Sequence, residues 1–65
     1  MQLIYTGKTN KNFNKDKEYH CTYLEIQEGQ KAIMKVQNKE DVSVELKYHE
    51  ITEFIKNWRL IKNEK

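Results

Sequence analysis

Val42-Ser43-Val44-Glu45-Leu46-Lys47-Tyr48 is the stretch of the chain with the most regular alternation of apolar and polar residues. Successive side chains of a β-strand point to opposite faces of the sheet, so a period of two residues indicates a strand with one buried face. The apolar residues of this stretch would face the core, and Ser43, Glu45 and Lys47 would face solvent. The segment therefore predicts a half-buried strand in a mainly β protein.

The residues before this strand predict a meander of antiparallel strands. Asn38–Asp41 has the composition of a turn, and the apolar face of a preceding strand is formed by Ala32, Met34 and Val36. Glu28-Gly29-Gln30 predicts a short hairpin turn before that strand.

Lys17–Gln27 predicts a further strand, but its apolar residues change phase. Tyr19, Cys21 and Tyr23 alternate with polar residues, whereas Leu24 and Ile26 occupy the opposite phase. A shift of one residue reverses the two faces of a strand, so both sets can face inward only across a β-bulge. We predict that bulge near Tyr23-Leu24, with one of these two side chains exposed.

The first part of the chain predicts a strand and a long polar loop. Met1–Thr6 alternates, with Leu3 and Tyr5 on one face. Gly7–Asp16 is rich in asparagine, which favours turns, and Phe13 is its only large apolar residue. We expect Phe13 to anchor the loop to the core.

After His49 the apolar period changes from two residues to that of a helix. Ile51, Phe54, Ile55 and Trp58 follow one helical stripe, which predicts one to two turns over Glu50–Asn57. Trp58–Ile61 predicts a closing strand with Trp58 in the core, and residues 62–65 predict a frayed tail. Five short strands with a helix before the last one predict a single small barrel over residues 1–65.

Several segments resemble those of known small barrels. Lys17-Glu18-Tyr19, the Glu28-Gly29 turn, the meander and Asn57-Trp58-Arg59-Leu60-Ile61 resemble the small SH3-like barrel proteins encoded by phages and low-GC Gram-positive bacteria. The resemblance covers roughly residues 3–62. It implies a five-stranded SH3-like barrel with a short helix before the last strand, and a phage or mobile-element origin. The chain lacks the Ala-Leu-Tyr-Asp-Tyr type of signature with which eukaryotic SH3 domains bind proline-rich peptides.

No grouping of residues in the sequence indicates catalysis. His20 and Cys21 are neighbours on a strand and would point to opposite faces, so they cannot act together as base and nucleophile. His20 and His49 lack the spacing of a zinc site, and the isolated Gly7 and Gly29 form no phosphate-binding motif. We therefore expect no enzyme activity, no metal and no cofactor, with Cys21 buried as a small apolar residue.

Cysteine content and hydropathy favour a cytoplasmic protein. Cys21 is the only cysteine, so no internal disulfide can form. The apolar run at Met1–Tyr5 is too short for a secretory signal, and no stretch approaches the ~20 apolar residues of a membrane-spanning helix. We expect no membrane association, and the host cytoplasm as the location if a phage encodes the chain.

The net charge of +2 is unevenly distributed along the chain. Residues 1–17 and residues 56–65 each carry a net charge of +3, whereas residues 18–55 carry −4. In SH3-like barrels the first and last strands lie side by side, and this arrangement would join the two basic ends into one surface. Such a surface attracts nucleic-acid phosphates or an acidic protein.

Two functions are compatible with these features. The first is a non-enzymatic protein-binding module, an adaptor or inhibitor that docks on a larger host or phage protein, with anti-defence activity as a subclass. The alternative is a nucleic-acid-binding barrel. The chain would be a monomer or a homodimer in either case. The expected partner-binding residues are Lys8, Lys11, Lys15, Lys17, His20, Tyr23, Lys56 and Arg59, and the tail residue Lys62 would extend the basic surface.

Overall fold

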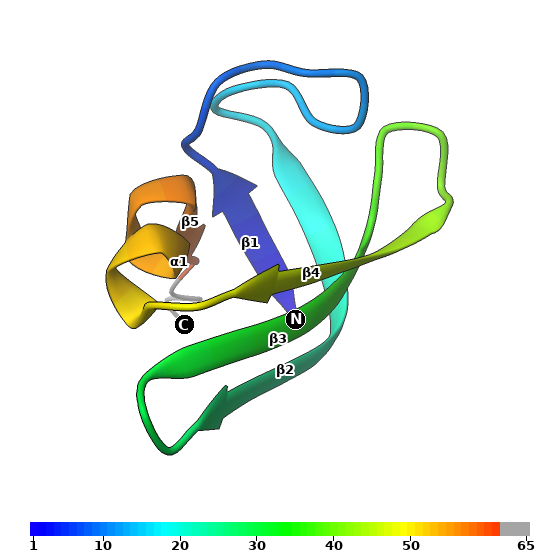
Figure 1. Ribbon diagram of the computed structural model, residues 1–65. Helices are drawn as coiled ribbons and strands as arrows, with labels where there is room; N and C mark the ends of the chain where they lie inside the picture. Colours follow the sequence, from blue (N-terminus) through cyan, green and yellow to red (C-terminus); the bar gives the residue numbers. More distant parts are fainter. Residues whose placement is uncertain (62–65) are drawn as a thin grey trace.

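The order of strands and helix follows the alternation of the sequence closely. The computed structural model describes residues 1–61. It contains β1 (Gln2–Tyr5), β2 (Glu18–Gln27), β3 (Lys31–Gln37), β4 (Ser43–Tyr48), α1 (Ile51–Asn57) and β5 (Trp58–Leu60), as Figure 1 shows. The predictions of a mainly β chain and of one short helix before the last strand are confirmed. The predicted tail, residues 62–65, lies outside the described residues.

All strand pairs are antiparallel, and the strand order is β4-β3-β2-β1-β5. The long strand β2 belongs to two sections of this sheet. Its first residues, Glu18–His20, pair with β1, and its remainder pairs with β3. The section formed by β5, β1 and the start of β2 therefore meets the β2-β3-β4 section at a bend in β2 (Figure 1).

The bulge that reconciles the two phases of β2 is present, one residue earlier than predicted. Cys21 pairs with Val36 and Tyr23 pairs with Lys35, so Thr22 is the extra residue. Cys21 and Leu24 consequently both face the core side. Tyr23 is 45% exposed and Leu24 is half-buried, which confirms that only one of these two neighbours turns inward.

The core contains residues from both sections of the sheet, from α1 and from the long loop. Its buried apolar members are Leu3, Tyr5, Phe13, Tyr19, Cys21, Ala32, Met34, Val36, Phe54 and Trp58. The expected burial of Phe13, Cys21 and Trp58 is therefore confirmed. Trp58 also donates a hydrogen bond from Nε1 to the Tyr48 hydroxyl at 3.0 Å, so its polar group is satisfied inside the core.

Tight turns join the strands of the meander. Gly29 has φ of +83° in the turn between β2 and β3, a conformation that glycine adopts without strain. In the turn between β3 and β4, Asp41 has φ of +62°, and its amide donates to the Asn38 carbonyl at 2.9 Å. Both turns lie where the sequence predicts them.

Four apolar residues are more exposed than the sequence pattern predicts, among them Leu60 at the end of β5, which is 61% exposed. Ile55 is 62% exposed because the two-turn helix turns Phe54 into the core, and the expected four-residue stripe does not form. Val42 precedes β4 and is exposed at the turn. Ile26 is opposite Ala32 but is exposed, since it lies near the end of β2 next to the hairpin turn.

Candidate functional site

The loop over Gly7–Lys17 connects β1 to β2 and is held to the core by one aromatic side chain. Phe13 is only 2% exposed. Its ring lies 5.2 Å from the ring of Tyr5 and 5.1 Å from the rings of both Tyr19 and Trp58, measured between centroids. The loop is therefore part of the same aromatic cluster that joins β1, β2 and β5.

Hydrogen bonds within the loop fix its backbone. The Asn10 side-chain oxygen accepts from the amides of Asn12 at 2.8 Å and Phe13 at 3.0 Å. The Tyr19 hydroxyl accepts from the Asn14 amide at 2.7 Å. Asparagine side chains that accept hydrogen bonds from nearby backbone amides stabilise a turn where those amides have no strand partner. The loop thus has a defined conformation although it contains no strand or helix.

The loop is also bonded to the turn between β3 and β4. The Asn38 side chain donates to the Asn12 side-chain oxygen at 3.0 Å, and the Lys39 amide donates to the Asn12 carbonyl at 3.0 Å. The Lys39 ammonium donates to the Asn14 side-chain oxygen at 3.0 Å. We call this region, Gly7–Lys17 together with residues 38–42, the loop–turn end.

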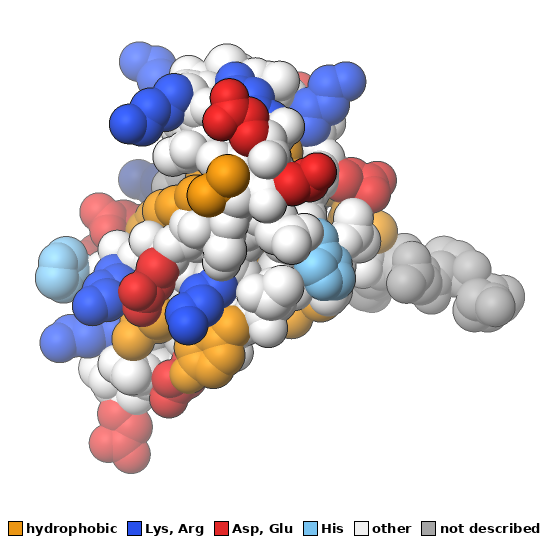
Figure 2. All heavy atoms as spheres, turned by 90° about the vertical axis from the view of Figure 1, so that its right-hand side faces the viewer, with side chains coloured by type: hydrophobic (Ala, Val, Ile, Leu, Met, Phe, Trp, Pro, Cys, Tyr) orange, Lys and Arg blue, Asp and Glu red, His pale blue; other side chains and the backbone are white. Residues whose placement is uncertain are grey.

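The loop–turn end exposes four of the predicted binding residues. The side chains that share this location and are exposed are Lys8, Lys11, Lys15 and Lys17. Figure 2 shows basic side chains gathered at the upper end of the molecule, where Figure 1 places the loop and the turn, with acidic side chains among them. The exposed acids of this end are Asp16, Glu40 and Asp41. The surface is therefore rich in lysine but mixed in charge.

The two basic ends of the chain meet at the end of β1. Thr6 donates from its amide to the Asn57 carbonyl at 2.8 Å and from its hydroxyl to the Lys56 carbonyl at 2.7 Å. On the other side, the Tyr5 amide donates to the Lys17 carbonyl at 2.9 Å. The pairing of β1 with β5 confirms that the first and last strands lie side by side. Lys17 and Lys56 thus flank the end of β1 from opposite sides.

Gly7 is necessary where these segments meet. A Cβ atom at this position would meet the Asn57 side-chain oxygen, and it would lie 2.7 Å from the Tyr5 hydroxyl. The absence of a side chain therefore allows the start of the loop to approach the end of α1 closely.

Arg59 and His20 lie on the outer face of the β1 section. Arg59 and Glu18 are both paired with Ile4, so the three side chains form a row across the sheet with the acid at one end. His20 is exposed, and its Nδ1 lies 2.8 Å from the side-chain oxygen of Gln2. Arg59 is thus one pair away from the end of β1, whereas His20 is opposite Gln2 at the start of β1. The acidic Glu18 lies between Lys17 and His20 along the chain.

Tyr23 is separated from the other predicted binding residues. It follows the bulge and belongs to the β2-β3-β4 section, where its hydroxyl donates to the carboxylate of Glu25. This hydrogen bond, together with the negative charges of Glu25 and Glu45, raises the pKa of Tyr23 above its usual value of 10.0. Lys35 is the cross-strand partner of Tyr23, so the surroundings of Tyr23 are mixed in charge, and they belong to a different section of the sheet from the lysine-bearing loop.

Comparisons with known proteins give no family assignment. No protein-family model, no curated protein and no solved structure matches the chain. Within residues 1–61, no three His, Cys, Asp or Glu side chains are grouped as a metal site would require. None of the helices described is long and apolar enough to cross a membrane.

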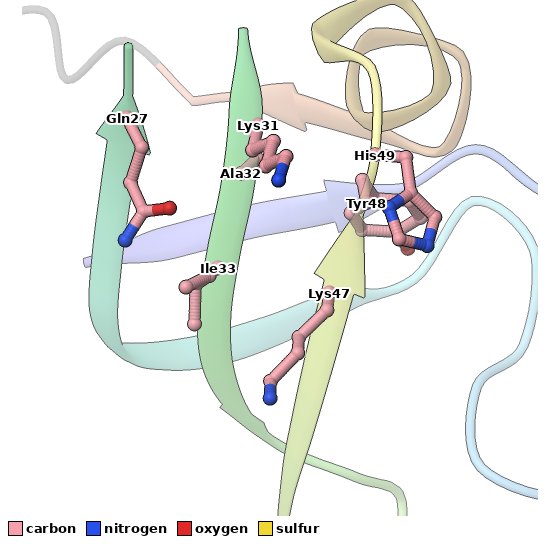
Figure 3. A pocket seen from close by; sticks show the side chains of 7 residues that line it. All are labelled: Gln27, Lys31, Ala32, Ile33, Lys47, Tyr48 and His49. Atoms are coloured by element: carbon pink, nitrogen blue, oxygen red, sulfur yellow. The ribbon is translucent and has the colours of Figure 1, made fainter. Parts of the chain in front are cut away.

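A shallow cavity of about 210 Å³ lies at the opposite end of the meander from the β3–β4 turn (Figure 3). Its lining contains no acid and consists of Gln27, Lys31, Ala32, Ile33, Lys47, Tyr48 and His49. The cavity was not predicted, because Lys31 and Lys47 are far apart in the sequence. Counting strand pairs back from the predicted turn at Asn38–Asp41 would have placed Lys47 beside Ile33, as observed.

Proposed function

We propose that the protein is a non-enzymatic protein-binding module that docks through its loop–turn end on an acidic surface of a larger host or phage protein. The observation that carries this proposal is the fixed conformation of the lysine-bearing loop, through Phe13 in the core and Asn10 and Asn12 in its hydrogen bonds. A loop that is ordered before binding loses little conformational entropy in the complex. Its lysines therefore present a preorganised pattern of charge.

The mixed charge of this end favours a protein as the partner. Lysines attract an acidic surface and accelerate the encounter, while Asp16, Glu40 and Asp41 require basic groups at matching positions. A uniformly negative polymer provides no such groups. Charge pairs of both signs give specificity, since a wrong partner brings like charges together.

The strand order and the single helix before β5 support the proposal of a small SH3-like barrel. The long loop after β1 and the bend in β2 are compatible with that architecture. Origin from a phage or mobile element, cytoplasmic location and inhibition of a host defence complex are parts of the proposal that rest on the sequence resemblance and composition.

A pair of matched charge reversals tests the proposed surface. The loop variant carries Lys11→Glu and Lys15→Glu, and the control variant carries Lys31→Glu and Lys35→Glu, so both change the net charge equally. All four lysines are exposed. Wild type and control are expected to recover the same stoichiometric protein from a bacterial lysate, identified by mass spectrometry, whereas the loop variant loses it. Equal recovery by both variants, with circular dichroism confirming that both are folded, would contradict the proposal.

Binding of nucleic acid is the second candidate, and the placement of Lys17 and Lys56 on either side of the end of β1 favours it. Arg59 is the only arginine, however, and arginine is the usual bidentate reader of phosphate and guanine. Affinity for duplex DNA would fall with salt with a slope of about −0.9 per neutralised phosphate. Lys8→Glu and Lys56→Glu would weaken binding, and Glu45→Ala would not. If wild type fails to shift DNA or RNA at low salt, this candidate is removed.

A further inference from the structure

Strand β4 has a free edge with hydrogen-bonding groups that β3 does not use. In the adjoining turn the Asn38 amide donates to the Val42 carbonyl at 2.9 Å. Hydrogen-bonded pairs recur at every second residue of an antiparallel ladder, so Val44, Leu46 and Tyr48 are the residues of β4 bonded to β3. The amides and carbonyls of the intervening residues, Ser43, Glu45 and Lys47, consequently point away from β3.

Nothing among residues 1–61 pairs with this edge. β4 is the last strand in the order β4-β3-β2-β1-β5 and has β3 on one side only (Figure 1). Strand β4 is six residues long and contains no proline, and its pairing with β3 has no register shift. Bulges, proline and very short length are common protections of an edge, and β4 has none of them, whereas β5 is only three residues long.

The charges of β4 are complementary to a second copy of the same strand. An antiparallel pair with its two-fold axis at Leu46 places Glu45 opposite the second copy's Lys47 and Lys47 opposite its Glu45. Both residues are exposed and have outward-pointing backbone groups, so each such pair is also joined by backbone hydrogen bonds. On the other face, Leu46 meets Leu46 and Val44 meets Tyr48, and these half-buried side chains lose further exposure.

The neighbouring registers of the same pairing and its parallel form are disfavoured. Shifting the axis by one residue toward either end of β4 places Glu45 opposite Glu45 or Lys47 opposite Lys47, and like charges directly opposite are destabilising. A parallel pair in register also brings identical charges together. Registers that match an apolar face to a polar face bury charged side chains and expose Val44, Leu46 and Tyr48.

We propose that the chain forms a symmetric homodimer by antiparallel pairing of β4 with β4 of a second copy, with the two-fold axis at Leu46. The five-stranded sheet then becomes a continuous ten-stranded one. The interface uses the same surface on both copies, as two-fold symmetry requires. It is separate from the lysines of the loop–turn end, so the proposed protein-binding function does not depend on it.

Charge exchange across the axis tests this dimer. Sedimentation velocity at protein concentrations up to about 1 mM, the weak end of specific association, is expected to show a monomer–dimer equilibrium for wild type. Glu45→Lys and Lys47→Glu each convert both cross-strand pairs into like-charge pairs and are expected to weaken the dimer by about tenfold or more. The double variant Glu45→Lys with Lys47→Glu restores opposite charges and is expected to recover dimerisation.

Two further variants separate the edge from general effects of charge and folding. Glu45→Pro removes an amide that points away from β3, so it is expected to abolish the dimer while leaving a folded monomer. Glu28→Lys makes the same charge change as Glu45→Lys at an exposed turn position and is expected to dimerise like wild type. A wild type that stays monomeric throughout, a dimer that survives Glu45→Pro, or a double variant that is not rescued would each overturn the proposal.

Discussion

Tyr48 and Trp58 are coupled by a hydrogen bond at the boundary of the core. The Trp58 indole donates to the Tyr48 hydroxyl, and the Tyr48 ring packs against Phe54 with 6.1 Å between centroids. Burial disfavours the charged phenolate and raises the pKa of Tyr48 above 10.0, although the hydrogen bond from Trp58 acts in the opposite direction. The stability of the fold therefore depends on a neutral Tyr48.

Replacing Tyr48 by phenylalanine is expected to destabilise the protein near neutral pH by about 1–3 kcal/mol, because the buried Trp58 N–H loses its acceptor. In wild type, the unfolded chain releases the Tyr48 proton at a lower pH than the folded chain does. The contribution of Tyr48 to the free energy of unfolding is thus fully present below about pH 10 and is lost as the pH rises above it. The difference in unfolding free energy between wild type and Tyr48→Phe should therefore shrink toward pH 11, as measured by urea denaturation.

Tyr23 provides the control for that measurement. Tyr23→Phe removes an exposed hydroxyl that donates to Glu25, so it is expected to change stability at neutral pH much less than Tyr48→Phe does. A Tyr48→Phe difference that stays constant between about pH 9 and about pH 11 would contradict the role given to Tyr48.

At the scale of elements, the loop and the β3–β4 turn depend on one buried polar side chain. The Asn38 side-chain oxygen accepts from the amides of Glu40 at 2.8 Å and Val42 at 3.0 Å, while its nitrogen donates to Asn12. Asn38 is buried, so its own side-chain oxygen and nitrogen would otherwise lack partners away from water. One residue thus sets the turn conformation and links it to the loop.

Asn38→Ala is expected to cost about 2 kcal/mol, because two amides lose their acceptor and the loop loses its link to the turn. Hydrogen exchange should show faster exchange at Glu40 and Val42 than in wild type. Asn38→Asp keeps an oxygen at the same position and is expected to retain most of the protection of both amides. If Asn38→Ala and Asn38→Asp lost the same amount of protection, the side-chain oxygen of residue 38 would not be what stabilises the turn.

The whole molecule is united by an aromatic cluster that includes residues far apart in the sequence. Tyr5, Phe13, Tyr19 and Trp58 have neighbouring rings and come from β1, the loop, β2 and β5. A 65-residue chain buries only about 60% of the surface that it exposes when unfolded, so stability is small and shared. The core is therefore expected to open cooperatively rather than in parts.

The rate at which the Cys21 thiol is labelled measures this opening. Cys21 is 2% exposed, and its thiol donates to the Tyr23 carbonyl at 3.2 Å. Labelling with a thiol-specific disulfide reagent is expected to be at least about a hundredfold slower in the folded than in the unfolded chain, since it requires opening of the core. The rate should rise with urea in parallel with unfolding followed by circular dichroism.

The adjacent position supplies the matched control. Thr22 is exposed on the bulge, so Thr22→Cys in a Cys21→Ala background is expected to react at the rate of a free thiol. If Cys21 in the folded wild type were labelled as fast as the thiol of this variant, the core would not shield Cys21.

The sequence by itself determined which residues form strands and which join them. Alternation over residues 42–48 and 17–27, turn residues at Gly29 and Asn38, and the apolar Phe13 in a polar loop were sufficient to predict β4, β2, both turns and the anchored loop. These are local properties, because side-chain direction along a strand depends only on position within it. The bulge was also predictable, although its exact residue was not.

Only the tertiary structure decided which surfaces these elements create. The placement of Lys17 and Lys56 on either side of β1 follows from the predicted pairing of the first and last strands. The position of Tyr23 outside the lysine-bearing loop, the exposure of Ile55 and the cavity beside Lys47 did not follow from periodicity. Each depends on strand register, the bend in β2 and how the loop packs. Those are set by contacts between distant residues, which a repeating pattern along the chain does not encode.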